Sequence, residues 1–221
     1  MRDQMTWAAP PRRHPAAWTA LAVGLGVFLW FVPLVRLRPL DAANDPAGFD
    51  AVAFAARHWK EDLVPALASA RPIEEVLAAV AANPAEACES FGRSIGLSRS
   101  CLFLVRGVGR IEAMSGGACL VRLTTPPNAT VALSTGLVFG TAARDVTGTV
   151  DPAARADSRD LAAAATEINR LVQERVIGPL TARGAVGRTI TFVACGQVQG
   201  RLPAGKPWKL IPLEALVTEE P

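Results

Sequence analysis

Residues 15–35 form a run of 21 residues without a charged side chain, and this run constrains the chain more than any other feature. Arg12 and Arg13 stand directly before it, and Arg36 and Arg38 directly after it. At about 1.5 Å per helical residue such a run is about 30 Å long, which is the hydrocarbon thickness of a bilayer. The sequence therefore predicts a transmembrane helix over residues 15–35.

The residues around this run favour an uncleaved signal anchor over a cleaved signal peptide. A cleaved signal has a shorter apolar region followed by small residues, whereas here Arg36 to Pro39 follow the run. A lipoprotein signal requires a cysteine directly after the apolar region, but the first cysteine of the chain is Cys88. Residues 1–14 are too few to form a domain, so we expect them to be a cytoplasmic tail. The predicted location is the inner membrane, crossed once, with an extracytoplasmic domain that follows a linker over residues 36–48.

The excess of basic over acidic residues lies beside the apolar run. The whole sequence has 23 basic and 20 acidic residues, but residues 39–221 have 18 basic and 19 acidic ones. Nucleic-acid-binding domains carry an excess of basic residues on their surface. We therefore expect no nucleic-acid partner, and the oligomeric state is left open.

Four cysteines follow the apolar run, at positions 88, 101, 119 and 195. None of them belongs to a C-x-x-C motif, and His58 is the one histidine after the run, so a zinc site is not expected. In an extracytoplasmic domain the four could form one or two disulfides with three possible connectivities. Alternatively, Cys101, Cys119 and Cys195 are buried free thiols in apolar strands.

The hydrophobic periodicity predicts an α+β fold. Short helices are expected in a helical subdomain over residues 49–96: one over 49–67 interrupted at Pro65, one from Pro72, and one that begins after Asn83 and ends at Gly92. A second subdomain over 97–221 is expected to contain strands at 101–114, 118–124, 129–134 with 137–141, 189–195 and 209–217, and a long helix over 158–177 that ends at Gly178-Pro179. This order matches a five-stranded OB-type β-barrel, which carries its helix between the third and fourth strands.

Several segments resemble an uncharacterised bacterial family of predicted periplasmic lipoproteins that is often found beside sugar ABC-transporter components. The most distinctive is Gly-Thr-Ala-Ala-Arg-Asp at 140–145. The other segments that carry the resemblance are residues 49–51, 58–59, 65–67, 103–109, 136–139, 167–169, 187–192 and 211–213. The resemblance implies an extracytoplasmic OB-like barrel with N-terminal helices and no established reaction. This chain differs in lacking the lipid-bearing cysteine, so its expected anchor is the apolar run.

The candidate ligand- or partner-binding residues are Thr141, Arg144, Asp145 and Asn169. Arg144 could donate a planar fork to a carboxylate or to sugar hydroxyls while Asp145 accepts hydrogen bonds. Alternatively, the two side chains pair with each other and hold a turn. Asn169 lies near the apolar stripe of the long helix, where it could contact a ligand or bond to a neighbouring loop.

The sequence contains no recognisable catalytic constellation, metal cluster or cofactor motif. The leading hypothesis is a non-enzymatic, membrane-tethered module that assists a sugar ABC transport system. The alternatives are an OB-type module that binds oligosaccharide or nucleic acid and, last, a hydrolase that uses Asp145.

Overall fold

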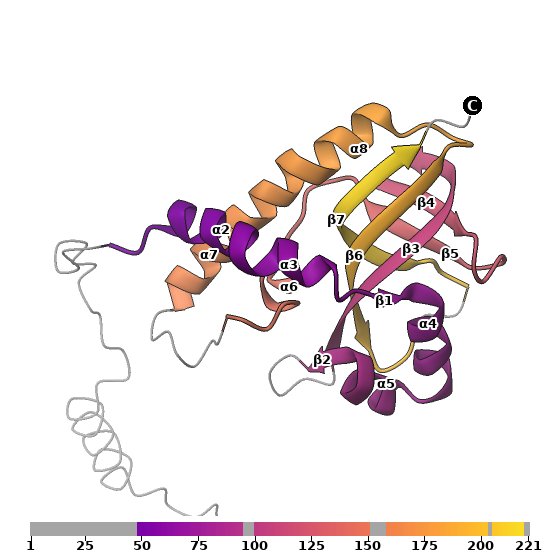
Figure 1. The fold of residues 1–221 in the computed structure, drawn as a ribbon, viewed down its shortest axis with the longest axis horizontal. Coiled ribbons are helices and arrows are strands. Elements are labelled where there is room, and N and C mark those ends of the chain that lie inside the picture. The colour runs from indigo at the N-terminus through magenta and orange to yellow at the C-terminus, as the bar shows by residue number, and fades with distance from the viewer. Residues whose placement is uncertain (1–47, 95–99, 151–157, 203–204, 219–221) are drawn as a thin grey trace, which may run out of the picture. The chain divides into compact units, whose positions relative to one another are not determined.

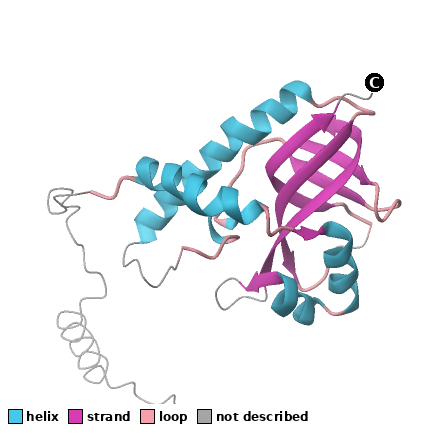
Figure 2. Cartoon of the chain, in the orientation of Figure 1, coloured by secondary structure: helices cyan, strands magenta, loops and turns pink. Residues whose placement is uncertain are grey.

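The architecture is a ring of paired strands with helices packed on its outside (Figures 1 and 2). The computed structural model describes residues 48–94, 100–150, 158–202 and 205–218. The helices are α2 (Ala51–His58), α3 (Val64–Leu67), α4 (Ile73–Ala82), α5 (Pro84–Phe91), α6 (Ala142–Asp145), α7 (Ser158–Val172) and α8 (Gly178–Arg183), with π-helical segments η1 (Trp59–Leu63) and η2 (Gln173–Ile177). The strands are β1 (Arg71–Pro72), β2 (Gly92–Ser94), β3 (Ser100–Ser115), β4 (Ala118–Leu123), β5 (Thr130–Ser134), β6 (Thr189–Gln199) and β7 (Trp208–Thr218).

Five strands pair in a closed circuit. The order is β3-β4-β5-β7-β6, and β6 pairs again with β3. Neighbours are antiparallel except for β5 and β7, which are parallel. The helix α7 lies between the third and fourth of these strands along the chain, so the predicted element order is confirmed.

The strand β3 closes the circuit because it pairs on both of its edges. It pairs with β6 from Ser100 to Arg110 and with β4 from Gly109 onward. A Cβ on Gly109 would run into the carbonyl oxygen of Arg122, so glycine is needed where the two strands approach. Gly109 thus permits a close backbone contact between β3 and β4.

Side chains of β3 alternate between two cores. Phe103 and Val105 point into a core inside the ring, together with Phe192 of β6. Leu102 belongs to a second core, in which α2, η1 and α7 pack against the outside of the ring. The two-residue period of a strand separates the two cores.

Both long helical segments contain a π-helical turn directly before a proline. The backbone N–H of Val64 donates to the carbonyl of Trp59 ahead of Pro65, and that of Gly178 donates to the carbonyl of Gln173 ahead of Pro179. A π turn widens the helix where proline lacks its donor and would clash with the preceding turn. The expectation that the second helix ends at Gly178-Pro179 is therefore wrong, since the chain stays helical to Arg183.

Two other expectations have different outcomes. Residues 137–141 were expected to be a strand, but they form a loop that leads into α6, because Thr141 begins a helical turn. The predicted transmembrane helix at 15–35 and its linker lie outside the described residues. None of the helices that the structure describes has the length and apolar character needed to cross a bilayer.

Candidate binding site beside the long helix

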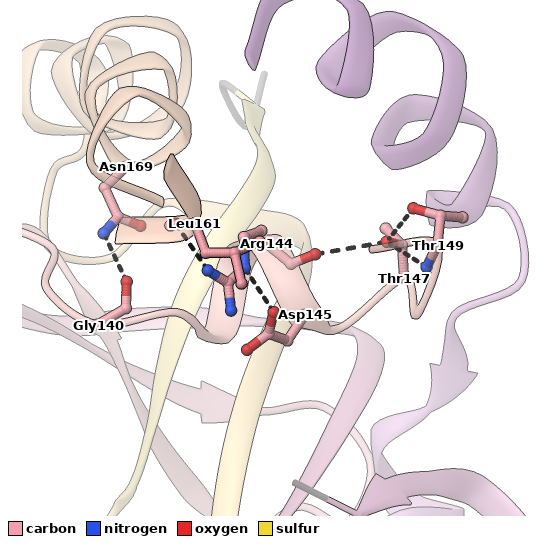
Figure 3. A network of polar contacts seen from close by, with 7 residues as sticks. All are labelled: Gly140, Arg144, Asp145, Thr147, Thr149, Leu161 and Asn169. Carbon is pink, nitrogen blue, oxygen red and sulfur yellow. Dashed lines mark hydrogen bonds and ion pairs between the residues drawn. The ribbon is translucent and has the colours of Figure 1, made fainter. Parts of the chain in front are cut away.

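The loop after β5 is fixed at both ends. At its start, the backbone N–H groups of Thr135 and Gly136 donate to the carbonyl of Gly117 at 2.8 and 3.0 Å. At its end, the side-chain amide of Asn169 on α7 donates to the carbonyl of Gly140 at 2.9 Å (Figure 3). Gly140 has a φ of +84°, which favours glycine at this position. The segment between these ties is therefore held in one place.

This segment exposes two large apolar side chains. Leu137 is 75% exposed and Phe139 is 76% exposed, while Val138 between them is half-buried and packs on the outer core. We call residues 137–141 the ridge. Apolar side chains that remain this exposed on an anchored backbone are typical of a contact surface.

Arg144 and Asp145 lie directly after the ridge, and both are mostly buried. Arg144 is 6% exposed, and its Nε donates to Oδ1 of Asp145 at 2.6 Å. Its Nη1 donates to the carbonyl of Leu161 on α7 at 2.7 Å, as Figure 3 shows. The arginine thus joins α6 to α7 from the inside, in line with the alternative in which the pair holds a turn.

The structure brings the four candidate residues together but gives them different positions. Arg144 and Asp145 face the interior. Thr141 is exposed on the ridge and lines the hollows on both of its sides. Asn169 ties the ridge to α7 and lines one of the hollows.

The first hollow, of about 460 Å³, lies between the ridge and α7. Its floor is mostly apolar, with Ala162 and Ala165 on the helix side. Gln173, one turn beyond Asn169, also lines it, and the Oε1 of Gln173 is buried with no hydrogen-bond donor among the described residues. A buried acceptor without a donor is costly, so Gln173 is an unusual residue in this lining.

The second hollow, of about 490 Å³, lies on the other side of the ridge, at the ends of β5, β6 and β7. Ser134, Gln197 and Lys209 give it a polar wall, and Phe139 stands at its rim. Sequence reasoning missed both hollows, together with Gln173, Leu137 and Phe139. The available signal was three apolar residues between Gly136 and Gly140, and these residues were predicted to form a strand.

A buried histidine lies close to the Arg144–Asp145 pair. His58 is 1% exposed, its Nδ1 lies 2.9 Å from Oδ2 of Asp62, and its ring stacks on Phe54. Burial lowers the pKa of His58 below 6.5; the bond to Asp62 and the charge of Asp145 oppose this shift, and the charge of Arg144 adds to it. Its Nε2 is buried and has no partner within the described part of the chain. The His58–Asp62 spacing of one helical turn was the sequence signal for this pair.

The cysteines divide into a disulfide and two buried thiols. Cys88 of α5 is bonded to Cys101 of β3. Cys119 and Cys195 are free, and burial raises their pKa values to about 11 and about 12. Thiols with such pKa values are protonated at neutral pH and unreactive. Across the described ranges, His, Cys, Asp and Glu do not gather in any group that could hold a metal ion.

Comparison with known proteins gives a family and a fold. The family described as predicted periplasmic lipoprotein (DUF2291) matches residues 22–214. The crystal structure of an OB-fold protein from Thermotoga maritima MSB8 is similar with a TM-score of 0.68 and 25% sequence identity, covering 77% of this chain and 99% of that chain. No curated protein matches the sequence.

Proposed function

This chain belongs to the predicted periplasmic lipoprotein family, and from that premise we propose that it is a membrane-tethered extracytoplasmic accessory protein. Its role is to bind a component of a transport system, a sugar ABC importer, without catalysing a reaction of its own. Family membership supports the extracytoplasmic location and agrees with the resemblance seen in the sequence. The Cys88–Cys101 disulfide is also typical of an oxidising compartment.

The observation that carries the binding role is the ridge. Leu137 and Phe139 remain in water although the rest of their loop is anchored to the β3–β4 turn and to α7. Ordering a loop costs conformational entropy, and an exposed apolar side chain gains little in return within the free protein. A fixed apolar loop therefore fits a surface that is covered in a complex.

The link to transport is tested by recovering partners from the native membrane. The tagged full chain is cross-linked in intact cells, purified, and compared with a Phe139→Ala variant and with an Ala variant of Leu216, an exposed residue of β7 outside the ridge. We expect a permease or its substrate-binding protein with wild type and with Leu216→Ala, and a loss with Phe139→Ala. Recovery of no transport component from any sample contradicts the proposal.

The location is tested separately. A C-terminal alkaline phosphatase fusion is active only when it is exported, so we expect activity. An inactive fusion that is present in normal amount contradicts the extracytoplasmic domain.

One observation favours a second candidate, an OB-type module that binds oligosaccharide. The second hollow places Phe139 beside the hydroxyl groups of Ser134 and Thr141 and the amide of Gln197, and aromatic faces with hydrogen-bonding groups suit a sugar ring. Calorimetric titration with a panel of oligosaccharides tests it: saturable binding that Gln197→Ala weakens supports this function. A hydrolase that uses Asp145 is the weakest candidate, because an Oδ1 that accepts from Arg144 is already engaged.

A further inference from the structure

We propose that the ridge and the hollows around it form one docking surface for an acidic protein segment that presents a protruding apolar side chain. This inference rests on the proposed function only in assuming a protein partner. It adds where that partner binds and which chemistry the partner's segment carries.

Neighbouring hollows share lining residues and therefore adjoin one another. The first and second hollows share Phe139, Gly140 and Thr141 as a common wall. The second shares Gln197 and Lys209 with a third hollow of about 310 Å³ at the β6–β7 connection. The surface therefore runs from α7, across the ridge, to the start of β7.

The shape of this surface indicates a protein rather than a small molecule. A small ligand in one hollow would cover one face of Phe139 and leave the other face in water, since Phe139 lines both hollows and is 76% exposed. A partner that covers the ridge must itself be concave and must place groups on both sides of it. Protein interfaces are built from such interlocking of aromatic side chains with hollows.

The first hollow specifies the apolar part of the segment. Its lining residues Ala162, Ala165 and Val138 are apolar, and a protruding aliphatic or aromatic side chain would be desolvated against them.

The other end of the surface specifies acidic residues. Arg201, Lys206 and Lys209 line the third hollow, and none of the described residues that line it is acidic. Carboxylates that follow the apolar side chain would meet this positive field and be steered by it.

Site-specific photo-cross-linking in cells tests the surface. A photoreactive phenylalanine analogue replaces Phe139 in the full chain, and the matched control replaces Leu216, which is 59% exposed on β7 and lines none of these hollows. We expect position 139, and not position 216, to cross-link to a protein peptide in which an apolar residue is followed by Asp or Glu. Cross-links to lipid, glycan or nucleic acid, equal cross-linking at both positions, or none at 139 would each overturn the proposal.

A charge exchange tests the acidic part. With the cross-linked partner purified, Phe139→Ala should weaken binding by about tenfold to a hundredfold, as for a central aromatic anchor. Lys209→Glu should weaken it by a few-fold at low salt, and replacing the partner's facing carboxylate by lysine should restore it. A Lys209→Glu variant that binds as wild type, or that no charge reversal rescues, overturns the acidic assignment.

The two proposals fail in different ways. If the cross-linked protein is not a transport component, the docking surface stands and the transport role fails. If a transport component co-purifies equally with wild type and Phe139→Ala, the role stands and the docking surface fails.

Discussion

Replacing Arg144 by alanine should destabilise the protein strongly, because this side chain is a buried link between α6 and α7. Its guanidinium is 6% exposed and its salt-bridge partner Asp145 is 14% exposed. The substitution leaves the carboxylate without its counter-ion and the carbonyl of Leu161 without its side-chain donor. The variant therefore loses one bond to α6, at Asp145, and one bond to α7, at Leu161.

The magnitude follows from the burial of the pair. Removing one member of a buried ion pair costs about 3–5 kcal/mol, because a buried charge is left uncompensated. The lost bond to Leu161 adds about 1 kcal/mol in general, although such contributions are not additive. Asp145 retains some contact with water, so we expect about 4 kcal/mol. This is a large fraction of the 5–15 kcal/mol that holds a typical domain together.

The assay is pulse proteolysis of the full chain in detergent over a urea series, which counts the folded fraction. Thr141→Ala is the matched control: Thr141 is exposed, makes no side-chain capping bond to α6, and should change stability by less than about 0.5 kcal/mol. A loss below about 1 kcal/mol for Arg144→Ala would refute the reasoning. It would mean that the Arg144 side chain contributes little to folding stability and is instead available to bind a ligand.

Three other predictions use the same assay. His58→Gln should flatten the pH dependence: its folded pKa lies below 6.5, so the unfolded chain binds more protons there, and wild-type stability is complete above pH 6.5 and falls as the pH drops toward the folded pKa. Replacing Cys88 and Cys101 together by serine should cost about 3 kcal/mol, because the bond closes a loop of moderate length. Gly109→Ala should cost on the order of 2 kcal/mol or more, because the added Cβ meets the backbone carbonyl of Arg122.

Each of these has its control. A His58→Gln variant that keeps the full wild-type slope contradicts the histidine argument, whereas Asp62→Asn should keep or extend the slope, because Asp62 raises the pKa of His58. Reductant should lower the stability of wild type and leave the double serine variant unchanged; equal sensitivity contradicts the disulfide prediction. For the glycine, Gly136→Ala should be tolerated, because its Cβ would meet only ordinary van der Waals contacts and no positive φ is required there.

Local signals predicted the elements whose ends are fixed by local bonds. Asn83-Pro84 predicted a helix start, and Oδ1 of Asn83 accepts from the backbone N–H groups of Ala85 and Glu86. The order of elements after residue 100 was predicted for the same reason, since each strand is bounded by turn residues. The domain boundaries and the transmembrane anchor stay predictions.

Tertiary contacts decided the rest, and the sequence does not show them. Leu137 and Phe139 have the spacing of a strand, but the same alternation arises in a loop whose middle residue, Val138, packs on the core. His58 was assigned to no candidate site from the sequence. Packing of α2 on α7 nevertheless brings it near Arg144, which lies 86 positions later in the chain. The disulfide partner of Cys88 was one of several until α5 and β2 placed it beside the start of β3.

The loop between β5 and α7 therefore has two parts with separable effects. Arg144 faces inward and fixes the loop. Phe139 faces outward, and its side chain contributes little to the stability of the free protein. Phe139→Ala should leave the urea midpoint unchanged and weaken partner binding, because its side chain is three-quarters exposed before binding. Arg144→Ala should lower the midpoint, and under conditions where it remains folded it should weaken binding less than Phe139→Ala, because the Asn169–Gly140 bond still holds the ridge. If Arg144→Ala weakens binding more than Phe139→Ala at equal folded fraction, the contact surface lies at the Arg144–Asp145 pair and not at the ridge.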